Sequence, residues 1–114
     1  MKDALRHKPG PLVQGTLDML ILRVLALEPM HGYGVTQRIT QVSQGAFAVG
    51  PGSLFPAFRR LERERLVASD WRATENNRRA KYYRITEAGR RRLKVETEDW
   101  RKQTVAIARL LAGS

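Results

Sequence analysis

The stretch ENNRRAKYYRIT, residues 75–86, indicates the turn and the second strand of a β-hairpin. Its second half alternates in side-chain direction, which places Lys81, Tyr83 and Ile85 on one face. Two asparagines stand at the reversal, where asparagine tolerates the left-handed backbone that a tight turn requires. Residues 67–74 alternate in the same way before the turn. The two segments predict an antiparallel hairpin whose turn is strongly cationic.

An amphipathic helix is predicted directly before this hairpin. In GPGSLFPAFRRLERERLV, residues 50–67, Ser53 is the expected N-cap, and Pro56 falls in the first turn, where its missing N–H does no harm. Apolar residues recur at helical spacing along one face. These positions are Leu54, Phe58 and Leu61, and the stem of Arg65 extends the same face. The opposite face is cationic and carries Arg59, Arg60 and Arg63.

Two further helices are predicted upstream. Thr16 is a good N-cap for a helix over residues 17–27, which is apolar nearly all round and is therefore expected to be buried or shared between subunits. His31 opens a shorter helix that ends near Ser43. Residues 47–49 are expected to form a short strand stub.

The last predicted helix begins after Thr86, which caps it, and runs to about Ala112 with Glu87 at its positive end. The whole order predicts a mainly α fold with a β-hairpin wing (α+β): a winged helix-turn-helix plus a long C-terminal dimerisation helix. The expected divisions are a flexible basic N-terminal tail over 1–14, a winged helix-turn-helix DNA-binding domain over 15–85, and the C-terminal dimerisation helix over 86–112.

Charge points to a polyanionic partner. The 114 residues carry a formal charge of +10, and residues 59–94 alone hold thirteen Arg or Lys against five Asp or Glu. Such concentration favours a binding face over general solubility, although a solvated basic surface is the alternative. The longest apolar stretch, residues 17–27, is too short to span a bilayer, so we expect a cytoplasmic protein with no membrane partner.

Nothing in the sequence indicates an enzyme. The chain has no cysteine, its two histidines have no accompanying carboxylate cluster, and no glycine-rich phosphate loop is present. The candidate nucleophiles are serines and threonines without a paired base. We therefore predict no catalytic residue, no metal site and no cofactor.

The order of helix and hairpin predicts a double-stranded DNA partner. A third helix in this position enters the major groove, and the hairpin meets a neighbouring groove or its phosphates. Plain turn chemistry explains the two asparagines equally well, and a solvated loop is the alternative for the wing arginines. Trp71, on the inward side of its strand, is expected to belong to the hydrophobic core.

The DNA contacts predicted from the helix and the wing are Ser53, Arg59, Arg60, Arg63, Asn76, Asn77, Arg78, Arg79 and Lys81.

Three segments resemble the PadR family of bacterial transcriptional regulators: GTLDMLILRVLALEPMHGYGVTQRI, GSLFPAFRRLERERLV and NNRRAKYYRITEAGRR. The motifs HGYG at 31–34, GSLFPA at 52–57 and KYYRIT at 81–86 are specific together and weak singly. The match extends from residue 15 to about residue 111, and the chain is similar to the small members that end in one long helix. The resemblance implies a homodimeric repressor that binds a pseudo-palindromic operator, often beside transporter genes or its own gene.

The resemblance also adds two DNA-contact residues. It implies that the Tyr33 hydroxyl donates to a phosphate, and a core tyrosine with a wet hydroxyl is the alternative. The family usually has tyrosine where Phe55 stands. Because Phe55 lacks that hydroxyl, it is expected either to pack against a sugar or to fill space.

The final helix is expected to join two copies of the chain. At 26 residues it is roughly 39 Å long, which exceeds what a small domain can cover, and its far half is apolar. A flat Trp100 lies in its apolar seam, where the resemblance allows a pocket for a small planar hydrophobic inducer; interface packing is the favoured alternative. The predicted dimer contacts are Leu17, Leu20, Ile21, Val24, Leu93, Trp100, Ile107, Leu110 and Leu111.

Two other functions stay open at this point. Charge alone does not separate DNA from RNA, so a basic RNA-binding module is one alternative, and exposed aromatic pairs on a sheet would support it. A winged helix that binds another protein is the second.

Overall fold

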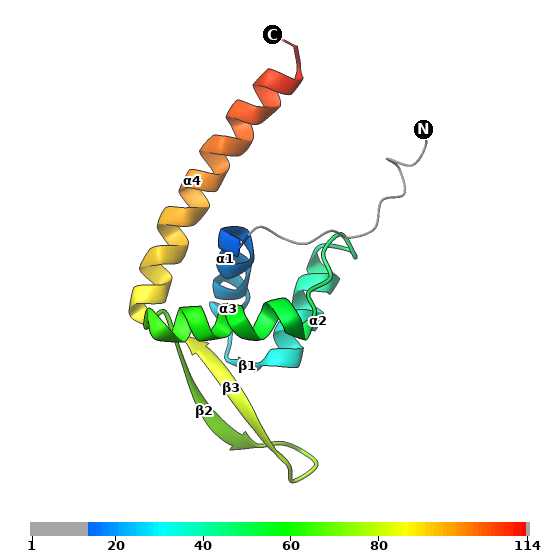
Figure 1. Ribbon diagram of the computed structural model, residues 1–114, viewed down its shortest axis with the longest axis vertical. Coiled ribbons are helices and arrows are strands. Elements are labelled where there is room, and N and C mark those ends of the chain that lie inside the picture. Colours follow the sequence, from blue (N-terminus) through cyan, green and yellow to red (C-terminus); the bar gives the residue numbers. More distant parts are fainter. Residues whose placement is uncertain (1–13, 114) are drawn as a thin grey trace.

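The structure, a computed structural model, describes residues 14–113 and shows the shorter helices grouped at one end of a small sheet, with a hairpin projecting on one side and one long helix on the other (Figure 1). Residues 1–13, nearly all of the predicted N-terminal tail, lie outside the described residues. The elements in order are α1 (Gln14–Leu25), β1 (Met30–His31), α2 (Gly32–Val42), α3 (Pro51–Arg63), β2 (Val67–Ala73), β3 (Arg79–Ile85) and α4 (Glu87–Leu111).

The sheet has three antiparallel strands in the order β1-β3-β2. The predicted hairpin is confirmed, and Val67 pairs with Ile85 at its base. The third strand is β1, not the stub expected at residues 47–49. Segment 47–49 has other partners for its backbone, because the Phe47 N–H donates to the Ser43 hydroxyl at 3.1 Å and its carbonyl accepts from the Thr40 hydroxyl at 3.3 Å.

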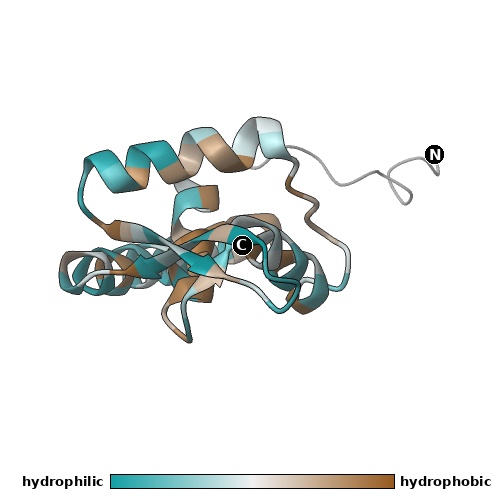
Figure 2. Cartoon of the chain, turned by 90° about the horizontal axis from the view of Figure 1, so that it is seen from below, coloured by the Kyte–Doolittle hydropathy of each residue, from teal (hydrophilic) through white to brown (hydrophobic). Residues whose placement is uncertain are grey.

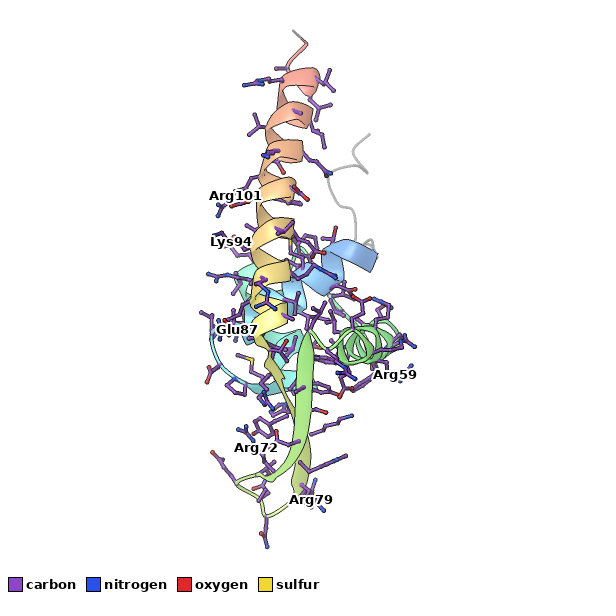
Figure 3. The ribbon with its side chains drawn as sticks, turned by 90° about the vertical axis from the view of Figure 1, so that its left-hand side faces the viewer. Arg59, Arg72, Arg79, Glu87, Lys94 and Arg101 are labelled. Carbon is purple, nitrogen blue, oxygen red and sulfur yellow. The ribbon has the colours of Figure 1, made fainter. Side chains whose placement is uncertain are left out.

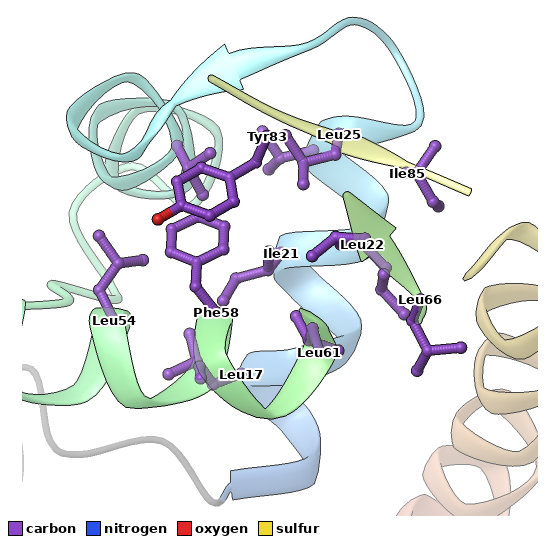
Figure 4. Close-up of a cluster of buried hydrophobic side chains, with 14 of the residues drawn as sticks. Leu17, Ile21, Leu22, Leu25, Leu54, Phe58, Leu61, Leu66, Tyr83 and Ile85 are labelled. Atoms are coloured by element: carbon purple, nitrogen blue, oxygen red, sulfur yellow. The ribbon is translucent and has the colours of Figure 1, made fainter. Parts of the chain in front are cut away.

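The core forms where α1, α2 and α3 meet β3. At its centre the ring of Phe58 from α3 stacks on Tyr83 from β3, with centroids 3.7 Å apart and planes 10° apart (Figure 4). The hydrophilic and hydrophobic residues alternate along the helices (Figure 2), and α3 buries the face that carries Leu54, Phe58 and Leu61. This face is the apolar face predicted from the sequence.

The first helix belongs to the chain's own core. Leu17, Ile21 and Val24 are buried, at 3%, 0% and 8% exposure. This corrects the expectation that they contact a second copy, because their side chains have almost no free surface left. Leu20, on another side of the helix, stays half-buried.

Helix α3 begins earlier than expected. Pro51 stands in the first turn after the N-cap Gly50, whose carbonyl accepts from the Ser53 N–H at 3.1 Å. Ser53 is therefore an exposed first-turn residue and not the cap, and Pro56 moves into the helix interior. The fixed backbone angle of proline suits a helix start, which explains the earlier beginning.

The end of α3 is a Schellman turn. The Leu66 N–H bonds the Leu61 carbonyl at 2.8 Å, and the Arg65 N–H bonds the Glu62 carbonyl at 2.9 Å. Arg65 occupies the left-handed position of this turn, with φ at 61°. It lies beyond the helix, so its stem does not extend the apolar face as expected.

Helix α4 starts on the end of this turn. Thr86 is the N-cap, as predicted: its hydroxyl accepts from the Gly89 N–H at 3.0 Å, and its own N–H donates to the Leu66 carbonyl at 3.0 Å. Gly89 is buried against this junction. The second half of α4 projects away from the hairpin (Figure 1), and every residue from 98 to 113 is exposed. No helix within residues 14–113 combines the length and apolarity needed to cross a bilayer.

Candidate nucleic-acid interface

A groove of about 620 Å³ separates α3 from the hairpin. We call the hairpin β2, β3 and residues 74–78 the wing. The start of α2 closes one end of the groove. Its lining combines aromatic rings with cations from three elements, among them Tyr33, Phe55, Arg59, Trp71 and Lys81.

The arginines of α3 do not share one environment. Arg59 and Arg63 are exposed, whereas Arg60 reaches across to α1 and pairs with Asp18 at 2.8 Å. The side chains of this pair are only 23% and 19% exposed. The expected placement of Arg60 beside Arg59 on the outer face is thus corrected, because successive helix positions lie about 100° apart and the next position turns toward α1. Its contact with DNA remains an untested prediction.

The wing ends in a cationic tip. The Thr74 N–H bonds the Arg78 carbonyl at 2.6 Å and closes the turn, and Asn77 has the expected left-handed backbone with φ at 62°. Asn76, Arg78 and Arg79 are exposed there. Figure 3 shows Arg59 and Arg79 toward one side of the molecule and Arg72 toward the other. The helix and the wing therefore present cations in the same direction.

Lys81 lies deeper in the groove and is partly neutralised. Its ammonium is 3.6 Å from the Glu62 carboxylate and 5.5 Å above the Tyr83 ring. Glu62 also accepts from the Ser69 hydroxyl at 2.6 Å. Burial, and then the charge of Glu62, raise the pKa of Tyr83 above its ordinary value. Because the Glu62 carboxylate lines the groove, the part of the groove beside it is a poor place for a phosphate.

Trp71 is exposed and not part of the core, contrary to the sequence expectation. Its side chain is 58% exposed, and the Arg79 guanidinium lies 5.7 Å from the ring centroid. Alternation along the strand gave the correct face, but the wing extends beyond the core before it reaches this position. Trp71 therefore lines the candidate interface, although the sequence did not indicate it as a DNA-contact residue.

Two aromatic residues complete the groove. Tyr33 is 67% exposed, which argues against the core alternative, and its ring stacks on His31 with centroids 6.5 Å apart. Phe55 is 43% exposed and also packs against Gly32, where an added Cβ would lie 3.4 Å from the ring. Both residues are placed to meet a ligand, and their contact with DNA stays a prediction.

A second surface lies on α4. Trp100, Ile107, Leu110 and Leu111 are exposed at 48% to 81%, while Leu93 packs against the core. The Trp100 side chain borders a shallow groove against α1, whose other members are Met19, Leu20, Arg23, Leu93, Thr97 and Arg101.

A charge cluster lies where α1, the end of α3 and α4 meet. Arg92 is 3.3 Å from Glu64 and 3.8 Å from Glu96, and one carboxylate oxygen of Glu96 is buried with no hydrogen-bond partner among the described residues. Burial is the main reason that the pKa of Glu96 is raised; Arg92 opposes the shift, and the carboxylates of Asp18, Glu64 and Asp99 add to it. Neither here nor elsewhere within residues 14–113 is a cluster of His, Asp or Glu arranged to hold a metal ion.

Three helices around a short sheet, followed by a cationic wing beside the third helix, define a winged helix-turn-helix protein. The profile described as "Transcriptional regulator PadR-like family" matches residues 21–95, and the chain belongs to this family. The predicted fold class and family are confirmed. Members of the family are transcriptional regulators, which confirms the prediction that the chain is not an enzyme.

Relatives from several bacteria agree with this assignment. The transcriptional regulator Rv3488 of Mycobacterium tuberculosis is 37% identical over 93 residues, which cover 82% of this chain and 79% of that protein. A PadR family regulator from Eggerthella lenta is 33% identical, covers 86% of this chain and 83% of its own, and superposes with a TM-score of 0.72. A PadR-like regulator from Bacillus cereus is 26% identical with a TM-score of 0.76, covering 89% of this chain and 96% of its own.

Proposed function

We propose that the chain is a homodimeric repressor that binds a pseudo-palindromic operator. The observation that carries this proposal is the groove between α3 and the wing, to which both elements present cations. In this arrangement α3 enters the major groove with Arg59 and Arg63, and the wing brings Arg78 and Arg79 to neighbouring phosphates. Residues 15–85 then form the DNA-binding domain.

Duplex DNA fits this surface better than the alternatives. The cations gather on a projecting helix and at a hairpin tip, which match the grooves of a duplex. A platform for unpaired bases needs aromatic rings on an open sheet face, and the face of the sheet that holds Tyr83 is covered by α3. A module for protein partners has no need for such a concentration of arginine.

Dimerisation through residues 86–112 is supported by the exposure of α4. Leu110 and Leu111 are 75% and 81% exposed, and a helix with such a face is rarely left uncovered in water. A groove between α1 and α2, which includes Leu27 and Val42, offers further apolar surface to a second copy. A two-fold axis at α4 would set the two copies of α3 about 34–36 Å apart, one turn of DNA.

The decisive experiment selects DNA fragments of the source genome that the purified chain retains, followed by anisotropy titration of the fragment recovered most often. Arg59→Ala is expected to weaken binding by about 1–3 kcal/mol, roughly fivefold to 150-fold, without a change in melting temperature. Arg91→Ala is the matched control, because it removes the same charge from an exposed site on α4. A parent chain that retains no fragment above background would refute the proposal, as would equal losses in the two variants.

We also propose that Trp100 packs between two copies of the chain, because exposed apolar side chains of α4 surround it. A pocket for a planar hydrophobic inducer beside Trp100 is the alternative. Its support is the position of the half-exposed indole over the groove against α1. In a Trp71→Phe variant, quenching of Trp100 fluorescence by planar aromatic compounds, together with release of operator, would support the pocket. Absence of both effects would leave Trp100 as interface packing.

A further inference from the structure

Trp71 is the largest side chain on the wing, and more than half of it is open to solvent. Its side chain is 58% exposed, although its own strand begins at a buried residue, Val67. The indole lies beyond the edge of the core, so its exposed surface is available to a ligand. Its most direct explanation is a contact with something that the chain binds.

The register of the hairpin shows which way Trp71 points. It pairs with Lys81, and the neighbouring pair on the same face is Ser69 with Tyr83. Tyr83 stacks on α3, and both Ser69 and Lys81 contact Glu62 of α3. Trp71 therefore continues the face of the wing that looks toward α3, and it lines the groove between them.

When α3 lies in the major groove of a duplex, one sugar–phosphate strand of the DNA enters the protein groove between α3 and the wing. The sugar–phosphate strand forms the wall between the major and minor grooves, so it must pass between a helix in one and a wing at the other. The groove lining includes the Glu62 carboxylate, which repels phosphate, together with several aromatic rings. The uncharged deoxyribose can pack against the aromatic rings, and the phosphate can pair with the cations at the edge of the groove.

We propose that Trp71 is a DNA-backbone contact: its indole packs against a deoxyribose of the strand that runs between α3 and the wing, and it holds Arg79 toward the adjacent phosphate. The guanidinium lies 5.7 Å from the indole centroid, so one ring supports both contacts. The contact is independent of base sequence, because sugar and phosphate are the same at every step. This inference rests on the proposed function, and it assigns Trp71 a part in it.

The test uses the fact that the chain has only two tryptophans. A Trp100→Phe variant makes Trp71 the sole indole emitter. Mixed-sequence duplex DNA at low salt is added, and acrylamide quenching of the emission is measured before and after saturation. We expect duplex to protect the indole from acrylamide.

Affinity variants provide the second readout. Trp71→Ala is expected to weaken binding to all duplexes by about tenfold, and to lower the slope of log affinity against log salt by about 0.9, because one phosphate fewer is neutralised. Trp71→Phe keeps a flat ring and should stay close to the parent. Arg72→Ala is the matched control, because Arg72 lies on the opposite face, with its guanidinium 5.1 Å from the Tyr82 centroid. Since Trp71 is exposed, its replacement should leave the melting temperature unchanged.

The outcomes separate this inference from the function on which it rests. Failure of the parent to bind any duplex would defeat the proposed function, and the contact with it. The proposed contact alone would be overturned if the parent binds duplex but the Trp71 indole stays open to acrylamide and Trp71→Ala binds duplex as tightly as the parent. Stronger protection by single-stranded DNA or RNA than by duplex would also overturn it, in favour of stacking on unpaired bases.

Discussion

Replacing Gly89 with alanine is expected to destabilise the chain, although alanine is the better helix former by about 1 kcal/mol. The reason is the close approach of α4 to the turn before β2. A Cβ on Gly89 would meet the carbonyl oxygen of Leu66 and would lie 2.7 Å from a side-chain carbon of Ile85. The clash involves a backbone atom, so no change of rotamer can relieve it.

The magnitude follows from what holds the Leu66 carbonyl in place. It accepts from the Thr86 N–H at 3.0 Å, and the Thr86 hydroxyl lies at 3.0 Å as well. A shift of α4 weakens both hydrogen bonds, each worth about 1 kcal/mol, and overpacking adds about 1–3 kcal/mol. After the gain in helix propensity of about 1 kcal/mol, the expected loss for Gly89→Ala is about 2–4 kcal/mol, or a melting temperature lower by on the order of 10 °C.

The assay is urea unfolding followed by far-UV circular dichroism at one protein concentration for all variants. Gly52→Ala is the matched control: Gly52 is an exposed helical glycine, and no heavy atom would lie within 4 Å of an added Cβ. It should gain up to about 1 kcal/mol. A Gly89→Ala variant as stable as the parent would show that α4 does not approach the turn this closely.

Four more predictions concern other parts of the molecule. Arg65→Gly should raise the free energy of unfolding by about 1 kcal/mol in the same urea assay, because Arg65 holds a left-handed backbone; a loss would contradict the turn geometry. Glu96→Gln should raise the melting temperature at pH 7. The pKa of Glu96 in the folded chain is raised above its ordinary value of 4.5, so the protonated carboxyl contributes fully to the stability of the fold only below that pH. This contribution is lost as the pH rises through the folded-state pKa and the carboxyl ionises. The stability gained by the glutamine variant should therefore be present at pH 7 and vanish in acid. Ile107→Asp with Leu110→Asp should abolish dimerisation and operator binding together, as measured by light scattering and anisotropy; a monomeric parent at micromolar concentration would disprove the dimer. Replacing the three wing cations named as DNA contacts (Arg78, Arg79 and Lys81) with alanine should lower the salt slope by about 0.9 for each phosphate that is no longer neutralised, and an unchanged slope would indicate a solvated loop.

Local signals in the sequence predicted most of this fold. The cap at Thr86, the left-handed Asn77 and the paired alternation of β2 and β3 each depend on a few neighbouring residues, and the structure confirms all of them. The apolar spacing of α3 likewise gave its buried face. These features need no knowledge of distant contacts, which is why they are readable from one sequence.

Contacts between distant segments account for the corrections. The partner of Arg60 is Asp18, 42 positions away, and no local pattern indicates that pair. An apolar helix such as α1 reads the same whether its own domain or a second copy covers it. The alternation that gave the face of Trp71 carries no information on where the core ends. Which DNA contacts are real depends on a partner outside the chain, so that part of the site remains a prediction.

At Thr86 no flexible linker separates the proposed DNA-binding domain from the proposed dimerisation helix. β3 ends at Ile85 and α4 begins at Glu87, and the bonds of Thr86 to the Gly89 N–H and to the Leu66 carbonyl hold the start of α4 against the turn before β2. If two copies join through α4, each copy of α3 is held rigidly relative to the dimer interface and not through a flexible linker. One base pair inserted between the half-sites would displace one of them by about 3.4 Å and turn it by about 35° around the duplex axis. Rigid arms cannot follow such a rotation, so spacing, as much as base identity, would decide which genomic sites this protein occupies.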